Sequence, residues 1–273
     1  MILGCKNSII PADVTSIGNS AFRDCSGLTS IVVPGSVTSI GASAFENCSG
    51  LTSITIPDSV TSIGNGAFRY CSGLTSINIP SSVTSIGKSA FYNCSRLTSI
   101  ILPFVGASKT ANSGYDQVFG YIFGYTASSS SSKVDGATYQ YYGPSDTYYG
   151  EYRYYHYYIP SALKEVTING RERISDYAFK NCSGLTSVTI GNGVTSIGDW
   201  AFYNCSGLTS VTIDNGVTLI GSSAFQGCSK LTTINYKGTI AQWKKISKGV
   251  SWRYNVPTFC RVKCTDGTIS IND

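Results

Sequence analysis

Apolar and small polar residues alternate in a short phrase that recurs through most of the chain. In the copy that begins at Leu51, Ile54 and Ile56 alternate with serine and threonine. A period of two predicts a β-strand with one buried face and one face in water. A second β-branched run follows at residues 60–63, and Gly64 comes directly after it. This run predicts another short extended segment that ends in a turn.

The rest of the phrase changes its spacing from two to three and four. Ala67, Phe68, Cys71 and Leu74 follow one another at these intervals, which places them on one side of a short helical turn. Each copy therefore presents Leu, Ile, Val, Ala, Phe and Cys to the inside. A single coil cannot bury all of them, so we expect the copies to stack and share one core.

The period of the phrase is 23 residues, and one cysteine column keeps it: Cys25, Cys48, Cys71, Cys94, Cys182, Cys205 and Cys228. A period in the twenties with Leu-x-x-Ile-x-Ile at its head is typical of leucine-rich repeats. The predicted fold is an α/β solenoid, a curved stack of 23-residue coils with parallel strands and short helical turns. Nine first strands are expected, beginning at Cys5, Leu28, Leu51, Leu74, Leu97, Leu163, Leu185, Leu208 and Leu231.

The phrase IPxSVTSIGxxAFxxCSxLTS resembles the BspA-like, or Treponema-type, leucine-rich repeats of bacterial and protist surface proteins. The resemblance covers residues 5–103 and 163–236, and the segment from Tyr236 through Trp243, with Trp252 after it, looks like the end cap of that family. It implies a secreted or wall-attached protein engaged in adhesion, with matrix glycoproteins such as fibronectin and fibrinogen as family partners. It carries over no catalytic residues.

A block of different composition, residues 104–162, interrupts the repeats and holds thirteen of the nineteen tyrosines. It leaves and rejoins the repeats at the same edge, and Asp135-Gly136 is a hairpin signal. The stretch from Tyr152 to Ile159 has strong strand propensity. An extended chain would place Tyr152, Tyr154, His156 and Tyr158 on one face, and Arg153, Tyr155, Tyr157 and Ile159 on the other.

Two interpretations of this block stay open. In one, it is a small β subdomain whose aromatic face packs on the solenoid. In the other, tyrosine and serine supply adaptable contacts at low entropic cost, as in antibody loops, and grip a glycoprotein or glycan. The candidate ligand-binding residues are Tyr152, Arg153, Tyr154, Tyr155, His156, Tyr157 and Tyr158.

Charge and hydropathy narrow the possible partners. The net charge of +5 lies entirely in residues 231–273, without an aromatic stacking motif or recognition helix, so we expect no nucleic-acid partner. The longest aromatic-apolar run has eight residues, so we expect no membrane insertion. The start of the chain lacks the features of a secretory signal peptide, and the surface location therefore comes from the resemblance alone.

The residues that could carry catalysis or bind a metal are few or repeated. The cysteine column is expected to be core thiols, and Cys260 and Cys264 are too far apart to bridge if extended. His156 is the single histidine, so no cysteine–histidine zinc spacing exists. No nucleophile elbow or phosphate loop accompanies it. We therefore expect no enzyme activity, no metal and no cofactor.

The sequence thus predicts four parts: repeats over 1–103, the Tyr/Ser-rich insert over 104–162, repeats over 163–236, and a cap over 237–273. In the cap, Thr239 should begin a helix with Trp243 inward and Lys248 in water, and residues 262–271 should form a hairpin. The function expected is adhesion or protein interaction, with the insert as the candidate contact surface. The alternative is a passive spacer that displays another domain.

Overall fold

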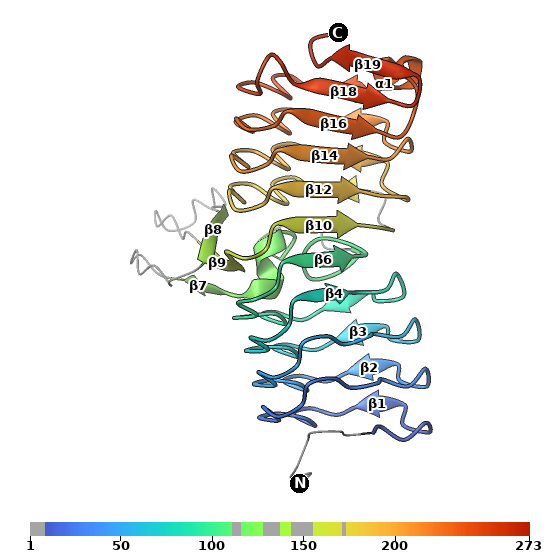
Figure 1. The fold of residues 1–273 in the computed structure, drawn as a ribbon, viewed down its shortest axis with the longest axis vertical. Coiled ribbons are helices and arrows are strands. Elements are labelled where there is room, and N and C mark those ends of the chain that lie inside the picture. Colours follow the sequence, from blue (N-terminus) through green and yellow to red (C-terminus); the bar gives the residue numbers. More distant parts are fainter. Residues whose placement is uncertain (1–8, 111–115, 128–136, 143–154, 171–172) are drawn as a thin grey trace.

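Repeated coils stack along one axis, with strand β1 (Ser16–Ile17) and strand β19 (Gly267–Ser270) at opposite ends of the stack (Figure 1). The computed structural model describes residues 9–110, 116–127, 137–142, 155–170 and 173–273. Buried Leu, Ile, Val, Ala, Phe and Cys side chains of successive coils join in one core cluster. These side chains are buried because neighbouring coils cover them, as expected for a repeat that cannot bury its own apolar face. The predicted leucine-rich-repeat solenoid is confirmed.

First strands pair in an eight-stranded sheet that runs through both repeat blocks. Pairing is parallel except between the last two strands, β18 and β19. Strands β6 and β10 pair directly, with Glu165 opposite Ser99, so this sheet continues past the insert without a break. The strands are β4 (Ser76–Asn78), β6 (Ser99–Leu102), β10 (Glu165–Ile168), β12 (Ser187–Ile190), β14 (Ser210–Ile213), β16 (Thr233–Tyr236), β18 (Arg261–Cys264) and β19 (Gly267–Ser270).

Two of the nine predicted first strands do not form as ladders. The segments that begin at Leu28 and Leu51 share an isolated bridge between Val32 and Thr55 and a backbone hydrogen bond from Thr52 to Thr29. Their Leu-Thr-Ser-Ile start matches that of the coil at Leu74, which does form a strand. No residue difference explains the loss. The strand predicted at Cys5 falls mostly outside the described residues.

Second segments form two separate four-stranded parallel sheets, one in each block. Residues 107–109 explain the interruption, because Ile86 donates its amide to the carbonyl of Ala107 and Ser108 bridges Ser85 in the antiparallel sense. This reversed segment covers the edge of β5. The N-terminal sheet contains β1 (Ser16–Ile17), β2 (Ser39–Ile40), β3 (Ser62–Ile63) and β5 (Ser85–Ile86), and the C-terminal sheet contains β11 (Arg173–Ile174), β13 (Ser196–Ile197), β15 (Leu219–Ile220) and β17 (Ser247–Lys248).

The predicted helical turn around each phenylalanine is instead a series of tight turns. Gly66 and Tyr70, which flank Phe68, both have positive φ, at 61° and 60°. Successive backbone amides donate alternately within their own coil and to the next coil. Ala67 donates to the carbonyl of Gly64 in its own coil, and Phe68 donates to that of Ala90 in the next coil. These bonds exclude an α-helix, because in a helix each amide donates to the carbonyl four residues earlier in the same segment.

A short 3₁₀ helix in the insert continues the stack of phenylalanine rings. The helix η2 (Phe119–Phe123) places Phe123 against Phe91, with ring centroids 6.4 Å apart, and Phe119 against Phe179, at 4.8 Å. One aromatic spine therefore crosses from the N-terminal block to the C-terminal block. Its members are Phe22, Phe45, Phe68, Phe91, Phe123, Phe119, Phe179, Phe202, Phe225 and Trp252.

Three strands of the insert form a separate sheet at the side of the stack (Figure 1). Its strands are β7 (Tyr125–Ala127), β8 (Ala137–Tyr142) and β9 (Tyr155–Pro160), and β9 is central and antiparallel to both others. The predicted strand over 152–159 is confirmed from Tyr155 onward. The hairpin turn predicted at Asp135-Gly136 lies outside the described residues.

The C-terminal cap closes the stack mostly as predicted. Thr239 caps helix α1 (Ile240–Lys245) and forms a capping box with Gln242, while Trp243 is buried. Strands β18 and β19 form the expected hairpin. The position of Lys248 was predicted incorrectly, because its ammonium lies 4.8 Å from the Trp243 ring centroid and donates to two backbone carbonyls. These contacts offset its partial removal from water.

Candidate functional site

The predicted tyrosine site is divided between described and undescribed residues. Tyr152, Arg153 and Tyr154 lie outside the described residues. Tyr155 and His156 lie in β9, where they pair with Ala127 and Thr126 of β7. Binding by this segment stays a prediction.

The next two tyrosines of β9 are buried against the solenoid. Tyr157 is 0% exposed and Tyr158 is 8% exposed. A Cβ added at Gly120 would lie 2.2 Å from the Cβ of Tyr157, so the glycine in η2 is what admits this side chain. The amide of Tyr158 donates to Gly124 at 3.0 Å. Both residues were candidates for ligand contact, but side chains this buried cannot meet a ligand unless the segment moves.

Tyr158 is held by an aromatic and cationic cluster on the N-terminal block. Its ring meets Tyr92 edge-on at 6.1 Å, and the guanidinium of Arg69 lies 4.9 Å from the ring of Tyr70 and 5.0 Å from that of Tyr92. Glu46 is only 6% exposed and lies 3.9 Å from Arg69. Burial raises the pKa of Tyr92, and the neighbouring tyrosines add to this shift. The cluster anchors the insert.

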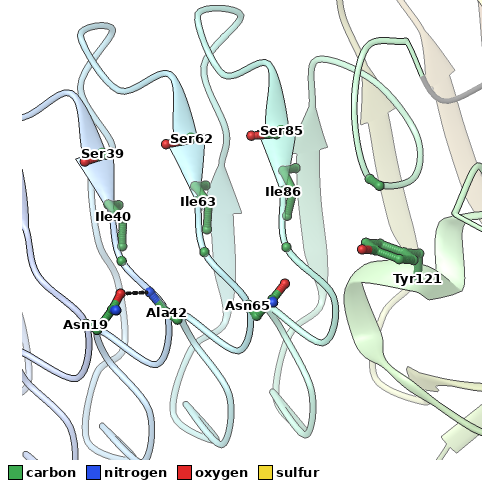
Figure 2. Close-up of a pocket in the computed structure, with 14 residues that line it drawn as sticks. Asn19, Ser39, Ile40, Ala42, Ser62, Ile63, Asn65, Ser85, Ile86 and Tyr121 are labelled. Atoms are coloured by element: carbon green, nitrogen blue, oxygen red, sulfur yellow. Dashed lines mark hydrogen bonds between the residues drawn. The ribbon is translucent and has the colours of Figure 1, made fainter.

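A shallow groove crosses the coils that carry β1, β2, β3 and β5, and Figure 2 shows its lining. Serine hydroxyls follow the strands along it, and Tyr121 of η2 points toward one end. We call this surface the serine groove. Its lining residues are Asn19, Ser39, Ile40, Gly41, Ala42, Ser62, Ile63, Gly64, Asn65, Ser85, Ile86, Gly87, Ala107 and Tyr121.

The shape of the serine groove follows from the stacking of the coils. A Cβ on Gly64 would lie 2.5 Å from the backbone nitrogen of Ala42 in the preceding coil, and Gly41 and Gly87 meet similar contacts. Glycine is therefore required where one coil passes close to the next. Asn19 accepts the amide of Ala42 at 2.8 Å, the interaction drawn in Figure 2, and so bridges neighbouring coils.

The serine groove is uncharged, and polar and apolar groups line it together. Its lining contains hydroxyls, amides and backbone groups but no carboxylate, lysine or arginine. Such a surface can donate and accept hydrogen bonds along an extended ligand. It lacks a base beside a nucleophile, the arrangement that covalent catalysis needs. Sequence reasoning missed the groove, although the repeated Ser-Ile-Gly was its signal.

Most of the cysteine column consists of buried thiols, as predicted. The thiol of Cys71 donates to the carbonyl of Phe45 at 3.1 Å, a bond to the preceding coil that recurs along the column. Cys25 is the exception, because it is disulfide-bonded. Free thiols are present at Cys48, Cys71, Cys94, Cys182, Cys205, Cys228, Cys260 and Cys264.

The described part of the chain contains neither a metal-binding cluster nor a membrane-spanning helix. There, no group of three or more histidine, cysteine or acidic side chains is arranged to hold a metal ion. Within the same residues, no helix has the length and apolar character needed to span a bilayer.

Comparison with known proteins identifies the repeat. The profile of the BspA type leucine rich repeat region matches in six copies, over residues 3–113 and 151–249. No curated protein matches the chain.

Several solved structures are similar in fold. A leucine-rich repeat protein from T. pallidum is 22% identical, with 84% of this chain and 79% of that one covered and a TM-score of 0.40. A leucine-rich repeat protein from Bacteroides ovatus is 20% identical, with 94% of this chain and 82% of that one covered and a TM-score of 0.33. A leucine-rich cell surface protein from Faecalibacterium prausnitzii is 24% identical, with 88% and 91% covered and a TM-score of 0.31.

Proposed function

Since the chain belongs to the BspA-type leucine-rich repeat family, we propose that it is a non-catalytic adhesion or protein-interaction module of a surface or secreted protein. Its partner would be an extracellular protein or glycoprotein, and the family resemblance suggests ligands such as fibronectin or fibrinogen. The proposal includes four parts: repeats over 1–103 and 163–236, the insert over 104–162, and the cap over 237–273. Repeat stacks of this kind present extended binding surfaces.

The serine groove is the observation that carries the proposal. It offers the same hydroxyl and glycine pattern in consecutive coils and ends at Tyr121, in the helix that leads into β7. Parallel strands repeat at about 4.8 Å, so the pattern supplies regularly spaced hydrogen-bonding groups to an extended ligand. Its lack of charge favours an uncharged polar stretch of the partner.

The insert is the second part of the proposed contact surface. It lies where the groove ends, and its undescribed residues include Tyr152, Arg153 and Tyr154. Tyrosine offers large contact area at a low cost in conformational entropy, which suits a recognition loop. The buried Tyr157 and Tyr158 would then anchor the insert while residues before them meet the partner.

A shortened insert tests its part in binding. Ala127 pairs with Tyr155, so residues 128–154, which include β8, can be replaced by Asn-Gly, a two-residue hairpin turn, without cutting η2 or β9. Binding to immobilised fibronectin and fibrinogen would be measured for both proteins. The shortened protein loses β8 but keeps the repeats, so we expect it to retain a cooperative thermal unfolding transition and to bind at least ten-fold more weakly.

The serine groove needs its own variant and a matched control. Ser62→Arg would place a long charged side chain in the groove, whereas Ser76→Arg makes the same change on an exposed position of β4, outside the groove lining. We expect only Ser62→Arg to reduce binding. Wild-type binding by both Ser62→Arg and the shortened insert would reject these contact surfaces, and absence of binding by the wild type would favour the spacer.

A further inference from the structure

Strand β18 carries two cations on the outer face of the eight-stranded sheet. Arg261 and Lys263 are exposed, whereas Val262 between them is fully buried. Alternate side chains of a strand point to the same face, so the two cations stand side by side on the surface, about 7 Å apart along the strand. Thr233 and Asn235 of β16 lie opposite them in the parallel ladder.

A third cation joins them from the neighbouring strand. Lys237 directly follows β16, and its amide donates to the carbonyl of Ile213 at 2.9 Å, so the ladder with β14 continues through this residue. Its exposed side chain keeps the alternation of inward and outward residues that β16 begins. Lys237 therefore lies on the same face as Lys263, one strand away. We call Arg261, Lys263 and Lys237 the basic patch.

The basic patch has no ion-pair partner among the described residues, whose ion pairs all lie between positions 23 and 176. The two carboxylates of the cap accept backbone amides instead. Asp266 accepts the first amide of α1 at 2.8 Å, and Asp273 accepts the last one of β19 at 3.0 Å. Asp214 follows β14 as Lys237 follows β16, but the two form no ion pair. The patch therefore keeps a positive charge that a partner can use.

The fold does not require these cations. In β12 and β14, serine takes the place of Arg261 and threonine takes the place of Lys263. Charged side chains on an edge strand can prevent pairing with a second chain, but the edge strand here is β19, and β18 lies inside the sheet. Neither the repeat nor the sheet edge explains the basic patch, which suggests a binding role.

Uncharged polar side chains continue from the basic patch along the sheet. Strands β16, β14 and β12 run side by side below β18 (Figure 1). Their outward side chains are partly exposed, and the hydroxyl of Ser210 donates to that of Ser187 at 3.4 Å. Neighbouring parallel strands lie about 4.8 Å apart, so these polar groups recur at that interval. We call the following residues the polar rows: Thr233, Asn235, Ser210, Thr212, Ser187 and Thr189.

We propose that the basic patch and the polar rows together bind a linear sulfated polysaccharide of the glycosaminoglycan class. Sulfate groups accept charge-assisted hydrogen bonds from arginine and lysine, and the guanidinium of Arg261 can bind two oxygens of one oxyanion. Sugar hydroxyls can exchange hydrogen bonds with the serine and threonine hydroxyls of the polar rows. Lys244 and Lys245, exposed on α1 at the same end of the stack, add to the positive potential that attracts a polyanion.

Two other anionic partners fit this surface less well. A DNA duplex carries one charge per about 1.7 Å, so it needs cations along its whole length, whereas the polar rows are uncharged. An anionic membrane surface would contact the cations but would gain nothing from the hydroxyls beside them. A chain that carries sulfates at intervals among hydroxyls uses both parts of the surface.

This contact surface is independent of the proposed function. It belongs to strands β12, β14, β16 and β18, whereas the serine groove belongs to the coils of β1, β2, β3 and β5. It also needs none of the insert residues. Either proposal could fail its test while the other passes.

Replacement of the cations by the residues of other coils provides the test variant. Arg261→Ser combined with Lys263→Thr restores the pattern of β12 and β14, so the thermal midpoint should not change. Isothermal titration calorimetry at about 0.15 M salt would measure binding of a heparin dodecasaccharide. We expect the wild type to bind it and the double variant to bind at least ten-fold more weakly. Hyaluronan, which carries carboxylates but no sulfate, should bind the wild type at least ten-fold more weakly than heparin does.

A second double variant provides the charge-matched control. Lys244→Gln combined with Lys245→Gln removes the same charge from α1, outside the basic patch, and should weaken heparin binding less than three-fold. The proposal is overturned if heparin does not bind, if hyaluronan binds equally well, or if the two double variants lose affinity equally. Tighter binding of a DNA duplex or of phosphatidylserine vesicles than of heparin would also overturn it, in favour of a nucleic acid or a membrane surface.

Discussion

At the residue scale, the cysteine column shows why one small side chain recurs in the core. Its thiols are buried, and each of several donates to the carbonyl of a phenylalanine in the preceding coil, as Cys94 does to Phe68 at 3.2 Å. The carbonyl of Phe68 also accepts the amide of Cys71 in its own coil at 3.1 Å, so the thiol adds a second hydrogen bond to it. Cysteine therefore fills a small space, and its weak S–H donor finds an acceptor in the preceding coil.

Alkaline pH should destabilise the protein through these thiols. Burial raises the pKa of Cys94 and Cys228 from 9.0 to about 12. Between these values the unfolded thiol loses its proton while the folded thiol keeps it, so the free energy of unfolding falls as pH rises. For each such thiol, the free energy of unfolding falls by about 1.4 kcal/mol per pH unit in this range.

Urea unfolding at pH 8, 9.5 and 10.5 would measure this effect. The Cys94→Ala variant should lose stability less steeply with pH than the wild type, and the comparison cancels contributions from lysine and tyrosine. Val83→Ala, which removes buried apolar volume but no titrating group, is the control. Parallel pH dependence in wild type and Cys94→Ala would contradict the assignment.

At the element scale, glycine decides how closely the coils approach. Most second segments end in Ser-Ile-Gly, and in the stacked coils the glycine faces the backbone of the preceding coil. The Gly64→Ala variant should lose about 1–3 kcal/mol of stability, because its Cβ would lie 2.5 Å from the amide nitrogen of Ala42. Chemical denaturation would measure the loss.

The first described coil supplies a matched control for that substitution. Gly18 holds the same place in the repeat, but an added Cβ there meets no atom within 4 Å. Gly18→Ala should therefore leave the denaturation midpoint nearly unchanged. Equal losses in the two variants would show that helix or turn propensity, rather than contact between coils, sets the requirement for glycine.

At the scale of the whole molecule, η2 joins two repeat blocks into one cooperative structure. Its Phe119 and Phe123 fill the gap in the aromatic spine, and both are 0% exposed. Repeat proteins unfold as coupled units whose coupling depends on the interfaces between neighbours. A weakened interface at η2 should therefore separate the unfolding of the two blocks.

Phe119→Ala tests this coupling. We expect a loss of about 3–5 kcal/mol at the interface. All three tryptophans lie between residues 200 and 252, so their emission reports the C-terminal block, while circular dichroism reports the whole chain. The two unfolding curves should coincide for the wild type and for Phe259→Ala, a change at a side chain that is 63% exposed, and should separate for Phe119→Ala. Coincident curves in all three proteins would reject the coupling role.

The sequence by itself determined the repeat, its register and its core. A period of 23 brings the same residue types to the same place in every coil, so the buried column of Phe68, Cys71 and Leu74 could be read directly. The cap helix at Thr239 and the hairpin after it were also predictable, because capping and turn signals act over a few residues.

Only the tertiary structure decided how neighbouring coils share their backbone groups. Amides that bond to the next coil replace the predicted helical turns with tight turns, and residues 107–109 end a sheet by reversing against β5. The serine groove, the burial of Tyr157 and Tyr158, and the placement of Lys237 beside Lys263 on one face likewise depend on contacts between distant residues. A local pattern specifies what a side chain can bury, but the packing between coils decides which side chains remain at the surface.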